Sequence, residues 1–286
     1  MAIKSVGIMG AGSMGHGIAQ VAAQAGYDVV MADIEDRLVD GAIKKIDKFL
    51  NKSVEKGKIS AEQKNGILAK IKGTTKVEDL ESSDFIVEVV PEEMELKKKV
   101  FQELDKLARK EVIIATNTSS LSVTEIAAST SRPDKVAGLH FFNPVPLMRL
   151  VEVIRGHYTS DETVKGCIDM ARSLGKEPIE VHSDIPGFVV NRLMIPHLME
   201  AINLYQSGVA SVEDIDKAAK LGLNYPMGPF ELMDLTGIDI AYHVVEYLHK
   251  ELDKDLKWTT PRLLRQMVRA NRLGVKTGAG WYSYRP

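Results

Sequence analysis

The sequence predicts an α/β domain with a doubly wound parallel sheet, followed by an all-α domain. A glycine-rich turn follows the first apolar segment, strand-like and helical segments alternate as far as residue 154, and only helical periods follow residue 184. Pro186 and Gly187 interrupt the chain at the point of change. We therefore place one domain over 1–184 and the other over 185–286.

The first 33 residues predict a strand, a turn, a helix and a second strand in that order. Residues 3–9 (IKSVGIM) form a short apolar run typical of a buried strand, and the apolar helical pattern that follows ends at Gly26. The segment 27–33 (YDVVMAD) predicts a second strand, which ends on Asp33.

Three glycines occupy the turn between the first strand and the helix. Gly10 permits a tight turn, Gly12 lets the main chain approach a pyrophosphate, and Gly15 lets the helix pack closely on the strand. The helix N-terminus offers N–H groups and a partial positive charge to the phosphates. Asp33 lies 21 residues after Gly12, the spacing at which a carboxylate accepts hydrogen bonds from ribose hydroxyls. These features predict a Rossmann-type dinucleotide-binding domain.

Asp33 also indicates which dinucleotide binds. A carboxylate repels the 2′-phosphate of NADP, and Ile34 supplies no compensating positive charge, so we expect NAD. Arg37 is near enough in sequence to offer such a charge, but we interpret it as a solvent-exposed helical residue.

The elements that follow continue the alternation. A long helix is expected over 35–58, and a second helix begins with the capping-box pattern of Ser60 and Gln63. Apolar runs typical of strands recur at 85–90, 112–117, 136–142 and 150–154. In the C-terminal domain, helical periods are found at 185–208, 211–222, 238–253 and 260–274.

The composition is that of a globular protein with an ample core. Hydrophobic residues make up 44% and charged residues 27% of the 286 residues, and the formal net charge is -2. This balance does not indicate nucleic-acid or membrane binding, and no apolar run approaches the roughly 18 residues of a membrane span. Cys167, the single cysteine, is interpreted as a buried packing residue. Because the glycine motif begins almost at Met1, we expect no targeting segment and a cytoplasmic location.

Polar residues that can carry chemistry lie in or after the predicted strands. Asn117 and Ser119 follow one apolar run, His140 lies near the end of the next, and Glu152 lies inside the run at 150–154. Ligands of a doubly wound sheet bind beyond the carboxyl ends of its strands. A carboxylate between two valines is costly to bury without a partner, and His140 is a suitable one.

Each of these residues also has a simpler interpretation. His140 could be a core or loop residue, Ser119 could cap the helix that follows it, and Glu152 could pair with a surface lysine. Their joint occurrence at strand ends beside a nucleotide fold favours a functional role for all three. The seven histidines show no zinc-binding spacing, so we expect no metal.

Longer motifs extend over nearly the whole chain. They include GIMGAGSMGHGIA near the start, HFFNPVP followed by LVEVI in the middle, PGFVVNRL followed by YPMGPFEL in the helical part, and KTGAGWY near the end. With these motifs the chain resembles the L-3-hydroxyacyl-CoA dehydrogenases, and among them the stand-alone bacterial 3-hydroxybutyryl-CoA dehydrogenases. The resemblance implies an NAD domain followed by a helical dimerisation domain.

The resemblance also implies roles for single residues. His140 transfers the proton, and Glu152 orients the His140 ring. Ser119 and Asn191 contact the substrate oxygen. Contacts with NAD are implied for Gly10, Ala11, Gly12, Ser13, Met14, Gly15, Asp33, Glu92, Lys97, Asn117, Ser119, Asn143 and Lys276. For the CoA part of the substrate, the lysine-rich helix after Asp33 offers Lys52 and Lys56, although charge runs on helices are usually solvated.

The expected function is the NAD-dependent interconversion of (S)-3-hydroxybutyryl-CoA, a short-chain 3-hydroxyacyl-CoA, and acetoacetyl-CoA, in fatty-acid or butanoate metabolism. We also expect a symmetric homodimer formed through the C-terminal domain. Two alternatives stay open: a dehydrogenase of the same fold that acts on a non-CoA 3-hydroxy acid or sugar acid, and an NAD-binding protein without turnover. A requirement for the CoA moiety distinguishes the first, and turnover distinguishes the second.

Overall fold

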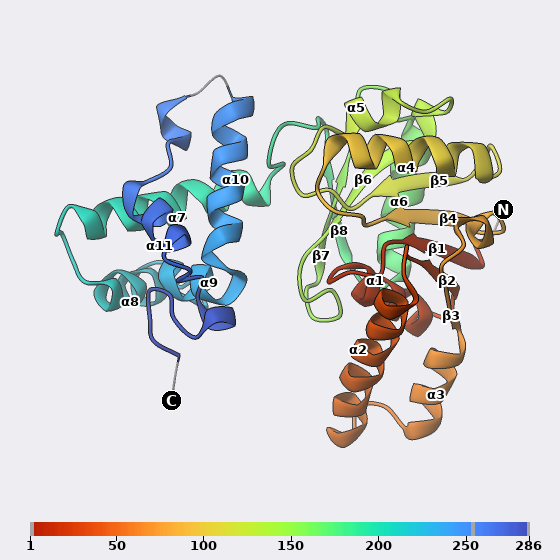
Figure 1. Cartoon of the computed structure of the whole chain (residues 1–286), viewed down its shortest axis with the longest axis horizontal. Helices are drawn as coiled ribbons and strands as arrows, with labels where there is room; N and C mark the ends of the chain where they lie inside the picture. The colour runs from red at the N-terminus through yellow and green to blue at the C-terminus, as the bar shows by residue number, and fades with distance from the viewer. Residues whose placement is uncertain (1–2, 253–254, 285–286) are drawn as a thin grey trace. The chain divides into compact units, whose positions relative to one another are not determined.

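The computed structural model describes residues 3–252 and 255–284. The chain divides into two compact units, the first ending at Ile185 and the second beginning at Pro186. The first is an α/β unit with a central sheet, and the second consists of helices (Figure 1). The predicted fold class, a doubly wound sheet followed by an all-α region, is confirmed.

One sheet of eight strands runs through the first unit in the order β3-β2-β1-β4-β5-β6-β7-β8. Neighbouring strands are parallel except β6 and β7, which are antiparallel. The connection between these two, residues 142–149, is too short for the crossover that a parallel pair needs. The strands are β1 (Ser5–Met9), β2 (Asp28–Ala32), β3 (Ile71–Thr74), β4 (Phe85–Glu88), β5 (Ile113–Thr116), β6 (Val136–Phe141), β7 (Leu150–Ile154) and β8 (Glu177–Val181).

The two edge strands are the ones that the sequence does not predict. β3 reads IKGT and β8 reads EPIEV, so neither is a continuous apolar run. Both lie at the ends of the strand order and are only partly buried. An edge strand needs fewer apolar residues than a central one, which is why hydrophobicity alone misses it.

The strand order reverses between β1 and β4. From β1 the chain continues through β2 and β3 in one direction, and from β4 it continues through β5 and β6 in the other. Ligands of doubly wound sheets bind beyond the carboxyl ends of the strands at this point. The glycine turn at 10–15 follows β1, and residues 89–93 follow β4, so both segments lie where a ligand is expected.

Helices cover both faces of the sheet. They are α1 (Gly15–Gln24), α2 (Asp36–Glu55), α3 (Ala61–Ala69), α4 (Met94–Leu107), α5 (Val123–Ala128) and α6 (Asp161–Ser173). Ser60 and Gln63 form the predicted capping box at the start of α3. Cys167 of α6 is fully buried, as predicted, and burial raises the pKa of its thiol to about 12.

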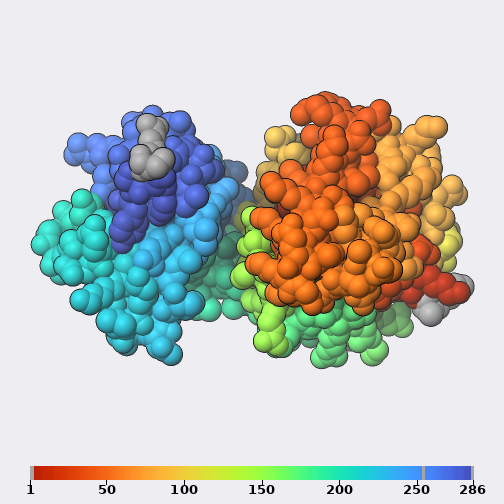
Figure 2. Space-filling view, turned by 90° about the horizontal axis from the view of Figure 1, so that it is seen from below, coloured from red at the N-terminus to blue at the C-terminus, as the bar shows by residue number. Residues whose placement is uncertain are grey.

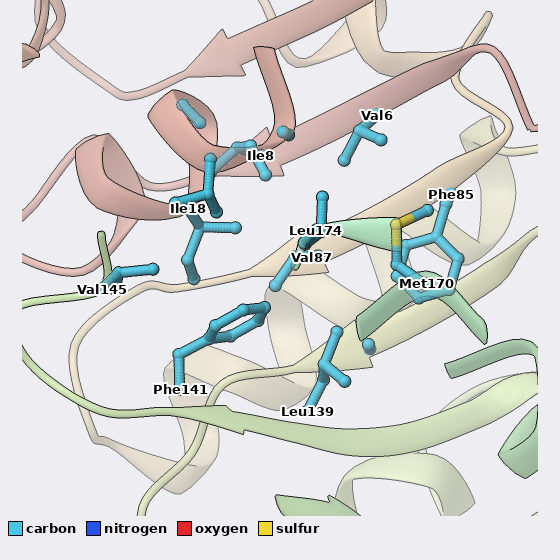
Figure 3. Packing of buried hydrophobic residues seen from close by; sticks show 14 of the residues in the cluster. Val6, Ile8, Ile18, Phe85, Val87, Leu139, Phe141, Val145, Met170 and Leu174 are labelled. Atoms are coloured by element: carbon cyan, nitrogen blue, oxygen red, sulfur yellow. The ribbon is translucent and has the colours of Figure 1, made fainter. Parts of the chain in front are cut away.

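Alternate strand residues pack against α1 and α6 in one hydrophobic cluster. Figure 3 shows side chains of β1, β4 and β6 pointing toward Ile18 of α1 and toward Met170 and Leu174 at the end of α6. The members of the cluster include Leu139 and Phe141 on β6 and Val151 and Val153 on β7. Because successive side chains of a strand point to opposite faces, the residues between them, His140 and Glu152, point to the other face.

The second unit has its own core of apolar helical residues. Its helices are α7 (Val190–Gln206), α8 (Val212–Gly222), α9 (Pro229–Thr236), α10 (Ile238–Glu251) and α11 (Arg262–Arg269). The sequence predicts all of these except α9, a short helix that begins with Pro229 after Gly228. Residue 253, the end of the helix predicted over 238–253, lies outside the described residues.

A buried aspartate, Asp234, holds the C-terminal segment of the second unit. Asp234 of α9 accepts hydrogen bonds from the Trp281 and Tyr282 N–H groups, at 2.9 Å each, and from the Tyr284 hydroxyl at 3.0 Å. A Cβ on Gly280 would lie 2.0 Å from Asp234 Oδ1, so only glycine fits there. These contacts fix the chain just after the predicted cofactor residue Lys276.

Within residues 3–252 and 255–284, no helix is long and apolar enough to cross a membrane.

Candidate active site

The glycine turn has the geometry that its sequence predicts. Gly10 has a φ of +116°, and a Cβ there would lie 2.7 Å from the Val89 carbonyl oxygen. A Cβ on Gly15 would lie 1.8 Å from the Gly10 oxygen, so the start of α1 packs directly on the turn. A Cβ on Gly12, by contrast, would meet nothing within 4 Å. The chain therefore leaves open space at the one glycine where a pyrophosphate is expected to approach.

Asp33 stands directly beside this turn. Its Oδ2 accepts a hydrogen bond from the Ala11 N–H at 2.6 Å, and its Oδ1 accepts one from the Ile34 N–H at 2.7 Å. Arg37 pairs with Glu35 at 3.2 Å, and its side chain is 79% exposed, which agrees with the interpretation of Arg37 as a solvated residue. The first turn of α1 carries no acidic side chain that would oppose a phosphate. The open space, the helix terminus and the carboxylate fit a dinucleotide.

His140 and Glu152 form a buried pair on neighbouring strands. They are directly opposite each other in the register of β6 and β7. His140 Nδ1 and Glu152 Oε2 are 2.7 Å apart, and the two residues are only 6% and 0% exposed. The Phe142 ring lies against the imidazole, with the ring centroids 4.5 Å apart. The structure thus favours the pairing of Glu152 with His140 over a pairing with a surface lysine.

Ser119 lies in the turn between β5 and α5, and it does not cap that helix. The cap is Ser122, whose hydroxyl accepts a hydrogen bond from the Glu125 N–H. Asn117, at the end of β5, accepts a hydrogen bond from the Phe141 N–H at 2.9 Å through its Oδ1. Asn117 therefore ties the end of β5 to the strand that carries His140.

Glu92 and Lys97 lie together beside Ser119. The Ser119 N–H donates to Glu92 Oε1 at 2.8 Å, and Lys97 Nζ lies 3.5 Å from Glu92 Oε2. Burial alone would raise the pKa of the Glu92 carboxyl, but the charge of Lys97 and the hydrogen bonds from Thr118 and Ser119 outweigh burial and lower the pKa. Glu92 is therefore a carboxylate at neutral pH.

The loop after β6 contains the predicted residue Asn143, which is exposed. Lys176, a residue outside the predicted site, holds this loop: its Nζ donates to the Val145 and Met148 carbonyl oxygens at 2.5 and 2.9 Å. Burial lowers the pKa of the Lys176 ammonium. Its position in the short segment before β8 gives no sequence signal of this role.

Glu88 is a second site residue that sequence reasoning misses. It ends β4, is 0% exposed and bonds to Lys97 Nζ at 2.8 Å. A signal for it exists, since FIVEVV places a carboxylate inside an apolar run just as LVEVI does for Glu152.

Of the remaining predicted residues, two belong to the second unit and two to the end of α2. Asn191 is buried in α7 of the second unit, and Lys276 lies in the 3-10 turn Val275–Thr277 with its Nζ 2.6 Å from Asp239 Oδ1. Lys52 and Lys56 are exposed at the end of α2, which with α3 forms the orange surface region of Figure 2. In the described part of the chain, no group of three or more His, Cys, Asp or Glu side chains is placed to hold a metal ion.

Similar proteins were found for the full length of the chain. It is 49% identical over 277 residues to 3-hydroxybutyryl-CoA dehydrogenase of Clostridioides difficile, covering 97% of this chain and 98% of that protein. It is 44% identical over 291 residues to the mitochondrial hydroxyacyl-coenzyme A dehydrogenase of Homo sapiens, covering 99% and 92%. The crystal structure of (S)-3-hydroxybutyryl-CoA dehydrogenase from Ralstonia eutropha matches with a TM-score of 0.95 and 45% identity, and covers 100% of both chains.

Family models match both units. The model of the 3-hydroxyacyl-CoA dehydrogenase NAD binding domain matches residues 5–185, and the model of the C-terminal domain of the same family matches residues 187–284. The predicted cofactor, NAD, is thereby confirmed. With a glycine turn, a buried histidine–glutamate pair and both family domains, this chain belongs to the 3-hydroxyacyl-CoA dehydrogenase family.

Proposed function

We propose that this protein interconverts (S)-3-hydroxybutyryl-CoA and acetoacetyl-CoA with NAD as the cofactor, and that His140 is its general acid and base. The observation that carries the proposal is the buried contact of 2.7 Å between His140 Nδ1 and Glu152 Oε2. The pair belongs to the sheet whose strand β1 leads into the glycine turn. The names of the relatives from Clostridioides difficile and Ralstonia eutropha support the choice of substrate.

The proton transfer is assigned to His140. Oxidation of a secondary alcohol requires a base for the hydroxyl proton, and a neutral imidazole is suited to this near neutral pH. Glu152 accepts the Nδ1–H, so Nε2 is the nitrogen that takes the proton. The carboxylate also stabilises the imidazolium that forms, and in the reducing direction this imidazolium returns the proton to the carbonyl oxygen.

The hydroxyl of Ser119 is assigned to the substrate oxygen, where a hydrogen bond stabilises developing negative charge. NAD held by the glycine turn and Asp33 would supply the hydride acceptor or donor for the carbon that carries this oxygen. The role implied for Asn191, which belongs to the second unit, stays a prediction, as do the CoA contacts of Lys52 and Lys56.

We also propose that the protein is a homodimer formed through the second unit. Large apolar side chains stand on the surface of that unit, among them Leu193, Leu221 and Leu235, which are 72%, 76% and 60% exposed. Exposed apolar side chains on a small helical domain are frequent at interfaces between subunits.

The proposed reaction is tested by the oxidation of NADH in the presence of acetoacetyl-CoA, followed by absorbance. We expect turnover with acetoacetyl-CoA and at least a hundredfold lower kcat/KM with free acetoacetate, because the CoA moiety contributes binding energy. Comparable activity on free acetoacetate would support the alternative of a non-CoA hydroxy acid. NADH binding without turnover on either compound would support the alternative of a non-catalytic protein.

A further inference from the structure

His16 is the second residue of α1, and its side chain bonds back to the glycine turn. His16 Nδ1 lies 2.7 Å from the Gly12 carbonyl oxygen. The backbone bond that an α-helix makes to the same oxygen, from the His16 N–H, is long at 3.4 Å. The side chain therefore supplies the short hydrogen bond at the point where the turn passes into α1.

Two side chains support the turn in this way. Asp33 accepts a hydrogen bond from the Ala11 N–H at 2.6 Å, and His16 donates one to Gly12. Within the described part of the chain, Met14, at the N-cap of α1, adds no capping hydrogen bond. A turn built on glycines loses much conformational freedom when it is fixed, and a site that is ordered before its ligand arrives binds more tightly. The bond from His16 thus orders the turn at Gly12, where the chain leaves open space.

The same bond decides which nitrogen of His16 carries the hydrogen. A carbonyl oxygen only accepts hydrogen bonds, so Nδ1 is the donor. In the neutral ring Nε2 then has a lone pair, which disfavours an anion beside it. A proton taken up at Nε2 gives an imidazolium, whose charge favours an anion, and the bond from Nδ1 is kept. Histidine is the side chain that normally changes charge between pH 5 and 8.

His16 is the one ionisable residue of the turn and of α1, residues 10–24. The loop at 142–148, where Val145 lies against Gly17 of α1, contains no ionisable residue. The connections that adjoin the turn carry Asp33, Glu35, Asp36 and Arg37 after β2, Glu92, Glu93 and Lys97 after β4, and Lys176, which holds the loop at 142–148. A substitution of His16 alone leaves all of these in place, so it isolates the contribution of His16 to any pH dependence.

We propose that His16 is a positioning and binding residue for the pyrophosphate of NAD. Its Nδ1–H holds the Gly12 carbonyl and so orders the turn, and its imidazolium adds a positive charge to the N–H groups and the partial charge of the helix terminus. Binding of NAD is then accompanied by the uptake of a proton from solvent at Nε2. The inference rests on NAD binding at the glycine turn and is independent of the reaction proposed above.

The test uses His16→Asn, His16→Ala and, as a matched control, His182→Asn. The side-chain nitrogen of asparagine takes the place of Nδ1, so His16→Asn keeps a donor for Gly12 but cannot become charged. His16→Ala removes both the donor and the charge. His16 is only partly buried, so neither change leaves a cavity in the core. The control residue, His182, follows the edge strand β8, and its side chain is 85% exposed.

The probe is ADP-ribose, which contains the pyrophosphate but lacks the nicotinamide, so its binding does not report on His140. Calorimetry should give a wild-type Kd about 3- to 10-fold lower at pH 6 than at pH 8.5, because the imidazolium lies within a Debye length of the pyrophosphate. His16→Asn should match the wild type at pH 8.5 within about twofold and lose most of the pH dependence. His16→Ala should also bind about 3- to 10-fold more weakly at pH 8.5. His182→Asn should keep the wild-type profile.

Two further measurements separate the charge of His16 from its hydrogen bond. Heats of binding at pH 7, in two buffers with different ionisation enthalpies, should show an uptake of about 0.3 to 1 proton per ADP-ribose in the wild type and almost none in either His16 variant. Amide hydrogen exchange without ligand reports on the bond: residues 12–16 should exchange at least about threefold faster in His16→Ala and unchanged in His16→Asn.

The inference is overturned if His16→Asn keeps the pH dependence or the proton uptake of the wild type, or if His16→Ala leaves the Kd at pH 8.5 and the exchange rates unchanged. Failure of the proposed function looks different. A wild-type protein that binds ADP-ribose with the expected proton uptake, but does not reduce acetoacetyl-CoA, would overturn the reaction and leave the role of His16 intact.

Discussion

At the scale of single residues, the substitution Gly12→Ala tests the cofactor site without disturbing the fold. A Cβ at this position meets no atom of the chain within 4 Å, so we expect Gly12→Ala to fold normally. The added methyl group occupies space that the pyrophosphate needs, and the Kd of NADH should rise by about tenfold or more. Fluorescence quenching measures this change.

Gly41 provides the matched control. It lies inside α2 and also has nothing within 4 Å of a Cβ, but it is outside the glycine turn. Gly41→Ala should leave the Kd of NADH unchanged and stabilise the protein by about 0.5 to 1 kcal/mol, the difference between glycine and alanine in a helix. An unchanged Kd in Gly12→Ala would mean that the pyrophosphate does not approach this glycine.

We expect the preference for NAD over NADP to depend on Asp33. We expect a higher kcat/KM with NADH than with NADPH, and Asp33→Ala should narrow the ratio because it removes the charge that repels a 2′-phosphate. Asp33 also accepts a hydrogen bond from the Ala11 N–H. The variant Asp33→Asn removes the charge but keeps a side-chain oxygen that can accept this bond, so it tests the charge alone. A wild-type enzyme that uses NADPH as well as NADH would contradict this assignment.

At the scale of the elements, Asp84 joins the start of β1 to the end of α4. Burial opposes its ionisation, but hydrogen bonds from the Lys4 N–H, from Arg109 and from Ser5 lower its pKa to about 2. Because the folded pKa is below the unfolded value of about 3.9, the ionised group stabilises the fold at neutral pH and loses this effect as the pH falls from about 4 to 2.

Asp84→Asn should therefore lower the free energy of unfolding by about 1 to 2 kcal/mol at pH 7, after allowance for solvent screening of the partly exposed Arg109. Urea unfolding at pH 7 and pH 3 measures the difference between wild type and variant. We expect the gap to shrink at pH 3. An equal difference in the free energy of unfolding at pH 7 and pH 3 would mean that the charge of Asp84 does not stabilise the contact between β1 and the end of α4.

The elements also show how far the sequence determines the site. The glycine turn, the capping box of Ser60 and the pairing of His140 with Glu152 follow from local pattern and strand alternation, and all three are found in the structure. The burial of Lys97 could not be predicted, because it depends on how α4 packs against β4, and a lysine in a charged helix reads as a surface residue. The sequence does not predict strands β3 and β8, because these edge strands have no continuous apolar run.

At the scale of the whole molecule, the proposed dimer is tested by mass. One chain has a mass of 31.6 kDa, so light scattering at micromolar concentration should give about 63 kDa. Leu221→Lys and Leu235→Lys place charges on the exposed apolar surface of the second unit and should shift the mass toward the monomer. A mass of about 32 kDa for the wild-type protein would contradict the dimer.

The catalytic claim for the whole enzyme depends on His140 and Glu152 acting as one unit. His140→Gln should keep NADH binding and lower kcat by roughly two to four orders of magnitude, the range typical of a lost general acid or base. Glu152→Gln should also lower kcat, because an amide no longer stabilises the imidazolium and no longer fixes the tautomer.

The kcat of the double variant His140→Gln, Glu152→Gln in the reduction of acetoacetyl-CoA is the most direct measurement. Since Glu152 acts through the histidine, we predict that the double variant is little slower than His140→Gln alone. If the two losses multiply instead, Glu152 acts independently of His140, and the assignment of the pair as the proton-transfer unit is contradicted.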